Sequence, residues 1–178
     1  MSTHRDREEP SSDISTWTLE RLRAFAAVAQ DQDLEAVRCV AQTRAGCSDQ
    51  PREVRLEWAK LALQASWSRH VEGPWARARA AQHCFMLRTR MIDELGPDDD
   101  PDWSPQRLAA DTVAELTLSP AAARALAEHW RDLPIERIGE LRRHKNMTAH
   151  LDTLLDHLRP GPTRDHLHLW RETRRHLP

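Results

Sequence analysis

The chain has 178 residues, enough for one compact domain that buries roughly two-thirds of its unfolded surface. Charged residues make up 30% of the sequence and the formal net charge is −2. This near-balanced charge excludes a strongly basic protein. No run approaches the ~18 consecutive apolar residues of a membrane span, which excludes a membrane-embedded chain. The three cysteines form no Cys-x-x-Cys pair, which argues against a disulfide framework and a structural zinc site. Together with a polar beginning unlike a signal peptide, these features predict a cytoplasmic protein with no membrane partner and no cofactor.

Helix signals recur along the whole chain after residues 1–14, which are predicted to be a disordered tail. Residues 15–178 are predicted to be a single helical domain. Ser104 and Ser119 each precede a proline, which is typical of a helix start because serine caps the first turn and proline is tolerated there. Asp49 ahead of Pro51 indicates another start. The sequence therefore predicts an all-α, multi-helix bundle of about eight or nine helices without strands, with helices near 16–30, 33–45, 50–71, 74–95, 105–117, 120–132, 134–143, 146–158 and 163–176.

Apolar residues recur at helical spacing inside these segments and predict the faces that form the core. Most of the seven tryptophans are expected to anchor that core, since a large aromatic side chain contributes much of its buried area. Trp67 and Trp75 are different, because they flank a predicted turn and are placed to face a partner. The aliphatic residues expected to be buried are Leu61, Leu126, Ile138, Leu151 and Leu154.

The segment 96–103, GPDDDPDW, is the one strongly acidic loop. Asp98, Asp100 and Asp102 have the alternate spacing that opens a calcium-binding loop. The rest of that loop is missing, since Trp103 stands where a glycine must turn and Ala109 where a bidentate carboxylate must close the site. The sequence predicts a solvent-exposed connection without a metal ion.

Residues 133–158 carry apolar side chains on two opposed faces. At about 100° per residue, Ile135, Ile138 and Leu141 point one way, whereas the later set that includes Met147 and Leu151 points nearly the opposite way. One straight helix cannot bury both faces in one core. The pattern predicts two helices with a bend near residues 143–146.

Residues 118–159 resemble the helix-turn-helix of sigma-factor region 4 and of response-regulator output domains. In that family a Leu-Ser-Pro or Leu-Thr-Pro start opens the first helix, and a Leu-x-x-x-x-Ile spacing follows on the second. The third helix repeats apolar residues at i, i+4, i+7 and i+11. Two short helices that cross at a turn would also explain the opposed faces. The matching residues are Leu118, Ser119 and Pro120, then Leu133 with Ile138, then Met147, Leu151, Leu154 and Leu158.

This resemblance implies a recognition helix near 146–158 that reads bases, preceded by basic side chains that bind phosphates. The charge distribution agrees with a polyanion-facing end, because residues 120–178 hold 11 Lys or Arg against 8 Asp or Glu, while residues 1–119 hold 15 against 20. The implied base-reading residues are Asn146, Thr148, His150 and Thr153, and the implied phosphate contacts are Arg142, Arg143 and Lys145.

A second resemblance covers residues 143–150. Lys145-Asn146-Met147-Thr148-Ala149-His150 is similar to the Arg-Asn-x-x-x-His motif of the HEPN ribonucleases, which are helical bundles. The resemblance implies metal-independent RNA cleavage through the ribose 2′-hydroxyl at a composite dimer site. His150 would be the general acid or base, Asn146 its neighbour, and Arg143 the arginine at the family's looser spacing.

A third interpretation needs no catalytic site. A helical adaptor, immunity or regulatory protein would bind a partner protein, or a second copy of itself, through an apolar groove or a Trp-rich face. We expect a regulatory protein, not an enzyme, that binds nucleic acid, DNA in particular, through the helix-turn-helix-like element. The protein-interaction module is the first alternative, and the ribonuclease is the second.

Overall fold

The computed structural model describes residues 13–98 and 100–178. The disordered tail expected at the beginning of the chain lies outside the described residues up to residue 12. Its predicted end is too late, because Ile14–Thr16 form a 3-10 turn. Asp13 caps this turn by accepting a hydrogen bond from the backbone N–H of Ser15 at 3.0 Å.

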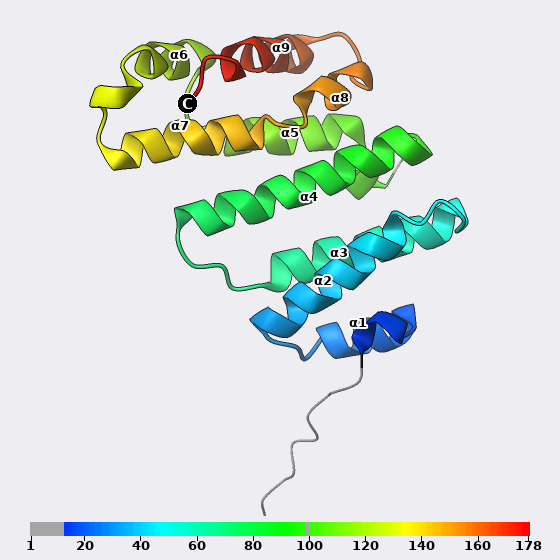
Figure 1. Cartoon of the computed structure of the whole chain (residues 1–178). Coiled ribbons are helices and arrows are strands. Elements are labelled where there is room, and N and C mark those ends of the chain that lie inside the picture. The colour runs from blue at the N-terminus through cyan, green and yellow to red at the C-terminus, as the bar shows by residue number, and fades with distance from the viewer. Residues whose placement is uncertain (1–12, 99) are drawn as a thin grey trace, which may run out of the picture.

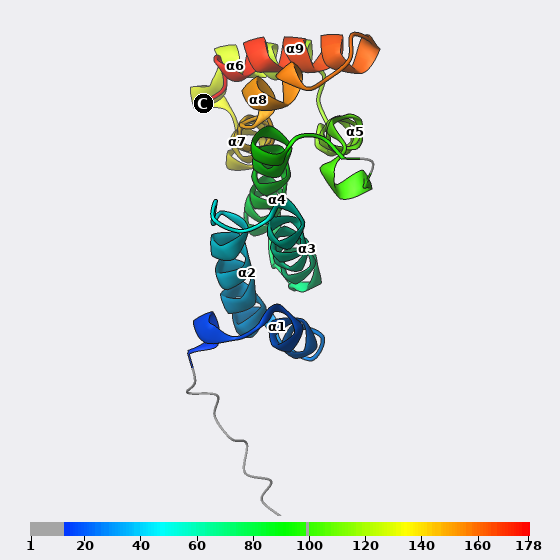
Figure 2. The ribbon, with the colours of Figure 1, turned by 90° about the vertical axis from the view of Figure 1, so that its right-hand side faces the viewer.

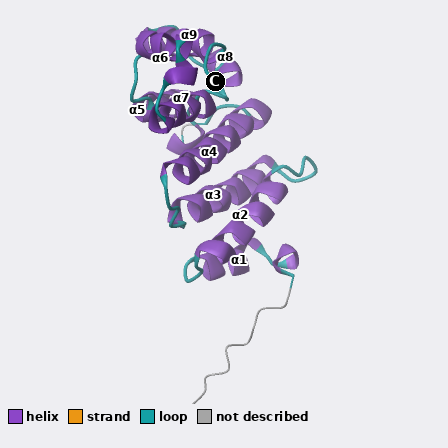
Figure 3. Ribbon diagram, turned by 60° about the vertical axis from the view of Figure 1, so that its left-hand side comes forward, coloured by secondary structure: helices purple, strands orange, loops and turns teal. Residues whose placement is uncertain are grey.

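The described residues form nine α-helices and no strand, which confirms the all-α prediction (Figure 3). No helix in residues 13–98 or 100–178 combines the length and apolarity needed to cross a membrane. Two further 3-10 turns cover Pro101–Trp103 and Trp130–Asp132. The helices are α1 (Leu19–Ala26), α2 (Asp31–Ala45), α3 (Arg52–Ser68), α4 (Pro74–Leu95), α5 (Pro105–Glu115), α6 (Pro120–Glu128), α7 (Ile135–Met147), α8 (Leu151–Asp156) and α9 (Pro162–Arg174).

The predicted serine caps are present at two helix starts. Ser104 Oγ accepts the N–H of Arg107 at the start of α5, and Ser119 Oγ accepts the N–H of Ala122 at the start of α6. Asp49 does not cap α3, which begins after Pro51 without a side-chain cap.

The helices stack in layers, from α1 at one end to α6 and α9 at the other, with α4 in the middle (Figures 1 and 2). Two clusters of buried apolar side chains lie on either side of α4, and we call them the N-terminal core and the C-terminal core. Cys84 and Leu87 of α4 pack in the N-terminal core, while Phe85 and Ile92 pack in the C-terminal core. One helix therefore supplies both cores from opposite faces.

The acidic loop is only half exposed, contrary to prediction, because its carboxylates form ion pairs with α3. Arg52 contacts Asp98 at 2.6 Å and Lys60 contacts Asp100 at 2.7 Å. Trp103, at the end of the loop, is buried. The segment fastens α3 to the connection between α4 and α5.

Only some of the residues predicted to lie in the core are fully buried. Leu61, Leu151 and Leu154 are almost fully buried, as predicted. Leu126 and Ile138 are only half-buried, less than predicted: Leu126 packs at the margin of the C-terminal core, and Ile138 lies outside it.

The break predicted inside residues 133–158 exists, but it lies later than residues 143–146. α7 runs unbroken to Met147, and α8 starts only at Leu151. The intervening turn spans Thr148–His150, where the hydroxyl of Thr148 donates to the carbonyl of His144 at 2.8 Å.

The later break follows from which side chains α7 buries. Ile135 was expected in the core but is 67% exposed, whereas Leu141, His144 and Met147 are fully buried. His144 takes a core position that an apolar pattern does not reveal. Because of it, α7 keeps one buried face as far as Met147, and the chain needs no earlier turn.

Candidate functional site: the groove between helices α4 and α7

The basic side chains predicted to bind phosphates are not gathered on one free surface. Arg143 donates to the carboxylate of Glu115 at 2.8 Å, and Lys145 donates to the backbone carbonyl of Leu177 at 2.8 Å. Arg142 is exposed, and no described residue forms an ion pair with it. Of the three predicted phosphate contacts, Arg142 alone is both exposed and unpaired within the described part of the chain.

The side chains predicted to read bases lie mostly below the surface. Thr148 and His150 are 0% and 4% exposed, and Asn146 and Thr153 are half-buried. The helix that would lie in a DNA groove, α8, is six residues long. This arrangement does not favour direct base contacts by Thr148 or His150.

His150 lies between α4 and α5 with its two ring nitrogens in different surroundings. Its Nε2 is 3.1 Å from Oγ1 of Thr112, whose hydroxyl donates to the carbonyl of Leu108 at 2.8 Å. Since the one hydroxyl proton is used there, Nε2 must carry a proton and donate to Thr112. Nδ1 then holds a lone pair, and it is buried without a partner among the described residues.

The surroundings of His150 keep it neutral. Burial lowers its pKa to about 4, and the nearby positive charges of Arg88 and Arg174 add to that effect. The Phe85 ring and the imidazole form an edge-to-face contact, with ring centroids 5.3 Å apart. Because Nε2 is engaged and Nδ1 is enclosed, this geometry does not favour the proton transfer expected of a ribonuclease histidine.

His144 is a second buried histidine, and it joins α7 to the connection between α5 and α6. Its Nδ1 donates to the carbonyl of Glu140 at 2.7 Å, and its Nε2 accepts the backbone N–H of Leu118 at 3.1 Å. The ring stacks on Trp170 at 5.1 Å, and burial lowers its pKa. With both nitrogens satisfied, His144 acts as a structural link.

A different surface, between the N-terminal ends of α4 and α7, combines a cavity with exposed apolar side chains. We call it the α4–α7 groove, and it encloses about 610 Å³, within the usual range of binding sites. Trp75 is 45% exposed and Ile135 is 67% exposed, although both are large and apolar. The residues that line it are Trp75, Pro134, Ile135, Glu136, Arg137, Gly139, Glu140 and Arg143.

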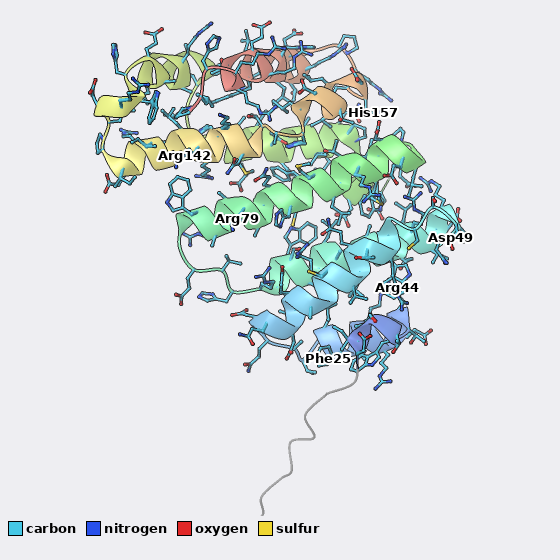
Figure 4. All side chains as sticks on the ribbon, viewed as in Figure 1. Phe25, Arg44, Asp49, Arg79, Arg142 and His157 are labelled. Atoms are coloured by element: carbon cyan, nitrogen blue, oxygen red, sulfur yellow. The ribbon has the colours of Figure 1, made fainter. Side chains whose placement is uncertain are left out.

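Gly139 lets the two helices approach at this groove. A Cβ atom at position 139 would lie 2.6 Å from Cζ2 of Trp75, closer than van der Waals contact permits. The indole therefore rests directly on the backbone of α7. Figure 4 marks the two helices that flank the groove, with Arg79 labelled on α4 and Arg142 on α7.

Charges of both signs border the groove. Arg137 contacts Glu140 at 2.6 Å, and Thr117 donates to the same carboxylate at 3.1 Å. Partial burial opposes ionisation of Glu140, but the bonds from Arg137 and Thr117 outweigh it and lower the pKa of Glu140. Glu136 is exposed, and the described residues offer it no ion-pair partner.

Two residues of this groove, Trp75 and Gly139, could be recognised from the sequence. Trp75, which was expected to face a partner because it flanks a turn, is exposed, as is Trp67 at 59%. Gly139 gave a signal that was not used, since an isolated glycine inside a helix usually marks a close approach of another element. Ile135 was missed because its spacing placed it on an apolar stripe expected to be buried.

Comparisons with known proteins give no further guide to this surface. No protein-family model, no curated protein and no solved structure matches the chain. Within residues 13–98 and 100–178, no group of three or more His, Cys, Asp or Glu is placed to hold a metal ion.

Proposed function

We propose that the chain is a non-enzymatic, helical protein-interaction module and that the α4–α7 groove is its docking surface. The observation that carries this proposal is the pair of exposed apolar side chains, Trp75 and Ile135, at one cavity floored by Gly139. A partly exposed tryptophan beside a cavity is the usual form of an interface anchor, because it offers a large apolar area with little entropy to lose. The cavity borders carry both charge signs, which suits a protein segment with apolar and charged residues.

The test is a selection from a displayed random-peptide library against the full chain. We expect enriched peptides with apolar anchors flanked by charged residues, and we expect their binding, measured by calorimetry, to weaken at least tenfold in Ile135→Asp. Tenfold corresponds to about 1.4 kcal/mol, the order of magnitude for removing one anchoring side chain.

Val28→Asp is the matched control. Val28 is also apolar and 80% exposed, but it follows α1 at the opposite end of the stack from α7 (Figure 1). Selected peptides should bind Val28→Asp as they bind the unchanged chain. Peptides that bind Ile135→Asp equally well would place the docking surface elsewhere and contradict the proposal.

Nucleic-acid binding is a second candidate, supported by the exposure of Arg142 and its lack of an ion-pair partner in the described part of the chain. Because Thr148 and His150 are buried, we expect phosphate contacts without base reading. Fluorescence anisotropy with a labelled DNA duplex should then show similar affinity for unrelated sequences and a steep loss with salt. Arg142→Ala should weaken binding to every sequence and flatten the salt dependence. Absence of salt-dependent binding would exclude this candidate.

A further inference from the structure

The excess positive charge of the C-terminal third lies in and around α9. Residues 159–178 hold 5 Lys or Arg against 2 Asp or Glu, whereas residues 120–158 hold 6 against 6. Helix α9 lies with α6 in the last layer of the stack, at the end opposite α1 (Figures 1 and 2). The charge excess is therefore located at one end of the molecule, and not along α7 and α8.

Basic side chains form one stripe along α9, which we call the α9 stripe. Its four members follow at spacings of four, three and four residues, so they point within about 60° of one another and span about 16 Å. The opposite face of the helix carries Leu167 and Trp170, which pack in the C-terminal core. The stripe consists of Arg164, His168, Arg171 and Arg175.

Two arginines of the α9 stripe lack an anionic partner within the described residues. Arg164 and Arg171 are half-buried, and their Nε atoms are buried without a hydrogen-bond partner there. Every other buried or half-buried arginine in the part of the chain that the structure describes contacts a carboxylate or a backbone carbonyl. Since a half-buried charge without a partner is unfavourable, an anion from outside the chain would stabilise both arginines.

We propose that the α9 stripe binds the phosphate backbone of a DNA duplex. A guanidinium donates to phosphate oxygens in pairs, and His168 can donate from a ring N–H. Each strand of a duplex carries one phosphate per about 3.4 Å of axis, so a stripe of about 16 Å can follow several phosphates. Phosphate contacts carry no sequence information directly, and we therefore expect binding without sequence preference.

This surface is separate from the docking surface proposed above. No residue of the α9 stripe lines the α4–α7 groove, so the inference does not rest on docking there. It gives the nucleic-acid candidate a binding surface other than Arg142.

Other anionic partners fit the α9 stripe less well. A helix that binds a lipid surface buries its apolar face in that surface, but the apolar face of α9 is already packed in the C-terminal core. Leu169 is 54% exposed, yet it lies one turn from Asp165 and one turn from Glu172, which an anionic membrane repels. Single-stranded nucleic acid stacks on aromatic side chains, and the ring of Trp170 is buried. A protein partner needs an apolar anchor, and the stripe contains none.

The experiment is fluorescence anisotropy of a labelled DNA duplex with the full chain, between about 50 and 200 mM salt. Arg164→Gln combined with Arg171→Gln should weaken binding roughly tenfold or more. It should also lower the slope of log affinity against log salt concentration by about two, because each lost phosphate contact removes about one. Arg77→Gln combined with Arg79→Gln is the matched control, since it removes the same charge from two exposed arginines of α4 that no described residue pairs with. The control should keep the slope of the unchanged chain.

Two single variants test the stripe without touching a half-buried arginine. Arg175→Gln, at the exposed end of the stripe, should lower the slope by about one, and it serves if the double variant fails to fold. Glu172→Gln removes an exposed negative charge next to the stripe and should strengthen duplex binding.

Three results would overturn the proposal: no salt-dependent binding of the duplex, an unchanged slope in the α9 variants, or an equal loss in the α4 control. Binding that is lost in Arg142→Ala and kept in the α9 variants would keep the nucleic-acid candidate but reject the α9 stripe. Binding of phosphatidylserine vesicles or of polyglutamate, without binding of the duplex, would assign the stripe to another polyanion and reject the proposal as well.

Discussion

The N-terminal and C-terminal cores are of similar size but differ in the polar groups that they enclose. The polar side chain enclosed beside the N-terminal core is Arg55, which donates to the carbonyl of Ala45 at 2.8 Å and pairs with Glu94. The C-terminal core is bordered by buried Arg88, which pairs with Asp111 at 2.7 Å, and in addition encloses two uncharged histidines, His144 and His150. An arginine stays charged at every physiological pH, whereas a buried histidine is stable only while it is neutral. The two halves of one helical stack therefore have different sensitivities to acid.

The largest effect should come from removing a tryptophan from the C-terminal core. Trp170 is fully buried and stacks on His144, so Trp170→Ala should lower the free energy of unfolding by about 3–5 kcal/mol. Urea unfolding, followed by circular dichroism, measures this loss. If α4 couples the two cores, the variant will keep one transition at lower urea. Two separate transitions, with only that of the C-terminal core shifted to lower urea, would show that the cores unfold independently.

Acid should destabilise the C-terminal core by a somewhat smaller amount. In the unfolded chain His150 titrates near 6.5, but burial lowers its pKa to about 4 in the folded chain. Stability is therefore complete above pH 6.5 and falls as the pH drops toward 4, because only the unfolded chain takes up the proton. The loss is about 3 kcal/mol for His150, and His144, whose pKa burial also lowers, acts in the same direction.

Hydrogen exchange at pH 7 and pH 4.5 locates this loss within the molecule. Amides of α7 and α9 should lose protection at the lower pH, while those of α2 and α3 should keep it. His150→Gln, which retains an N–H donor for Thr112 but does not titrate, should show a smaller change between the two pH values. An equal loss of amide protection in α2 and α3 would contradict the proposed difference in acid sensitivity between the two cores.

The smallest effect should come from Gly139→Ala, which tests the groove and not the cores. Alanine favours a helix by up to about 1 kcal/mol over glycine, but its Cβ would displace the indole of Trp75. Because Trp75 is 45% exposed, it can swing into solvent, so we expect a change in stability below about 1 kcal/mol. The expected result is a red shift of the Trp75 fluorescence, which is isolated by subtracting the spectrum of the variant that carries Trp75→Phe. Docking at the groove should also weaken. An unshifted spectrum would show that Trp75 does not rest on α7.

Helix positions could be predicted from the sequence wherever local chemistry determines them. Proline and glycine limit α4, whose predicted range, 74–95, matches the structure, and serine caps mark the starts of α5 and α6. The end of α7 could not be predicted in this way, because His144 is accepted in the core only through its bonds to Glu140 and Leu118. The bond to Leu118 brings together segments 26 residues apart in the chain, and an apolar pattern contains no information about it.

The groove could be predicted only in part. Trp75 next to a turn was a usable signal, but Ile135 belongs to an apolar stripe, and a stripe does not say whether a neighbour covers it. The predicted nucleic-acid contacts illustrate the same limit. Lys145 suits a phosphate by type, yet it binds the carbonyl of Leu177, a contact that depends on how the end of the chain folds back.

The position of α4 between two cores restricts how the chain can vary in length. Cys84 and Phe85 are neighbours in the sequence, yet they face different cores. Inserting one residue into α4 would rotate everything after it by about 100°, and both cores would lose their register at once. Substitution in α4 harms one core at a time, whereas insertion harms both. Length variation in this protein should therefore be tolerated in the α3–α4 connection at residues 69–73, and not in α4 itself.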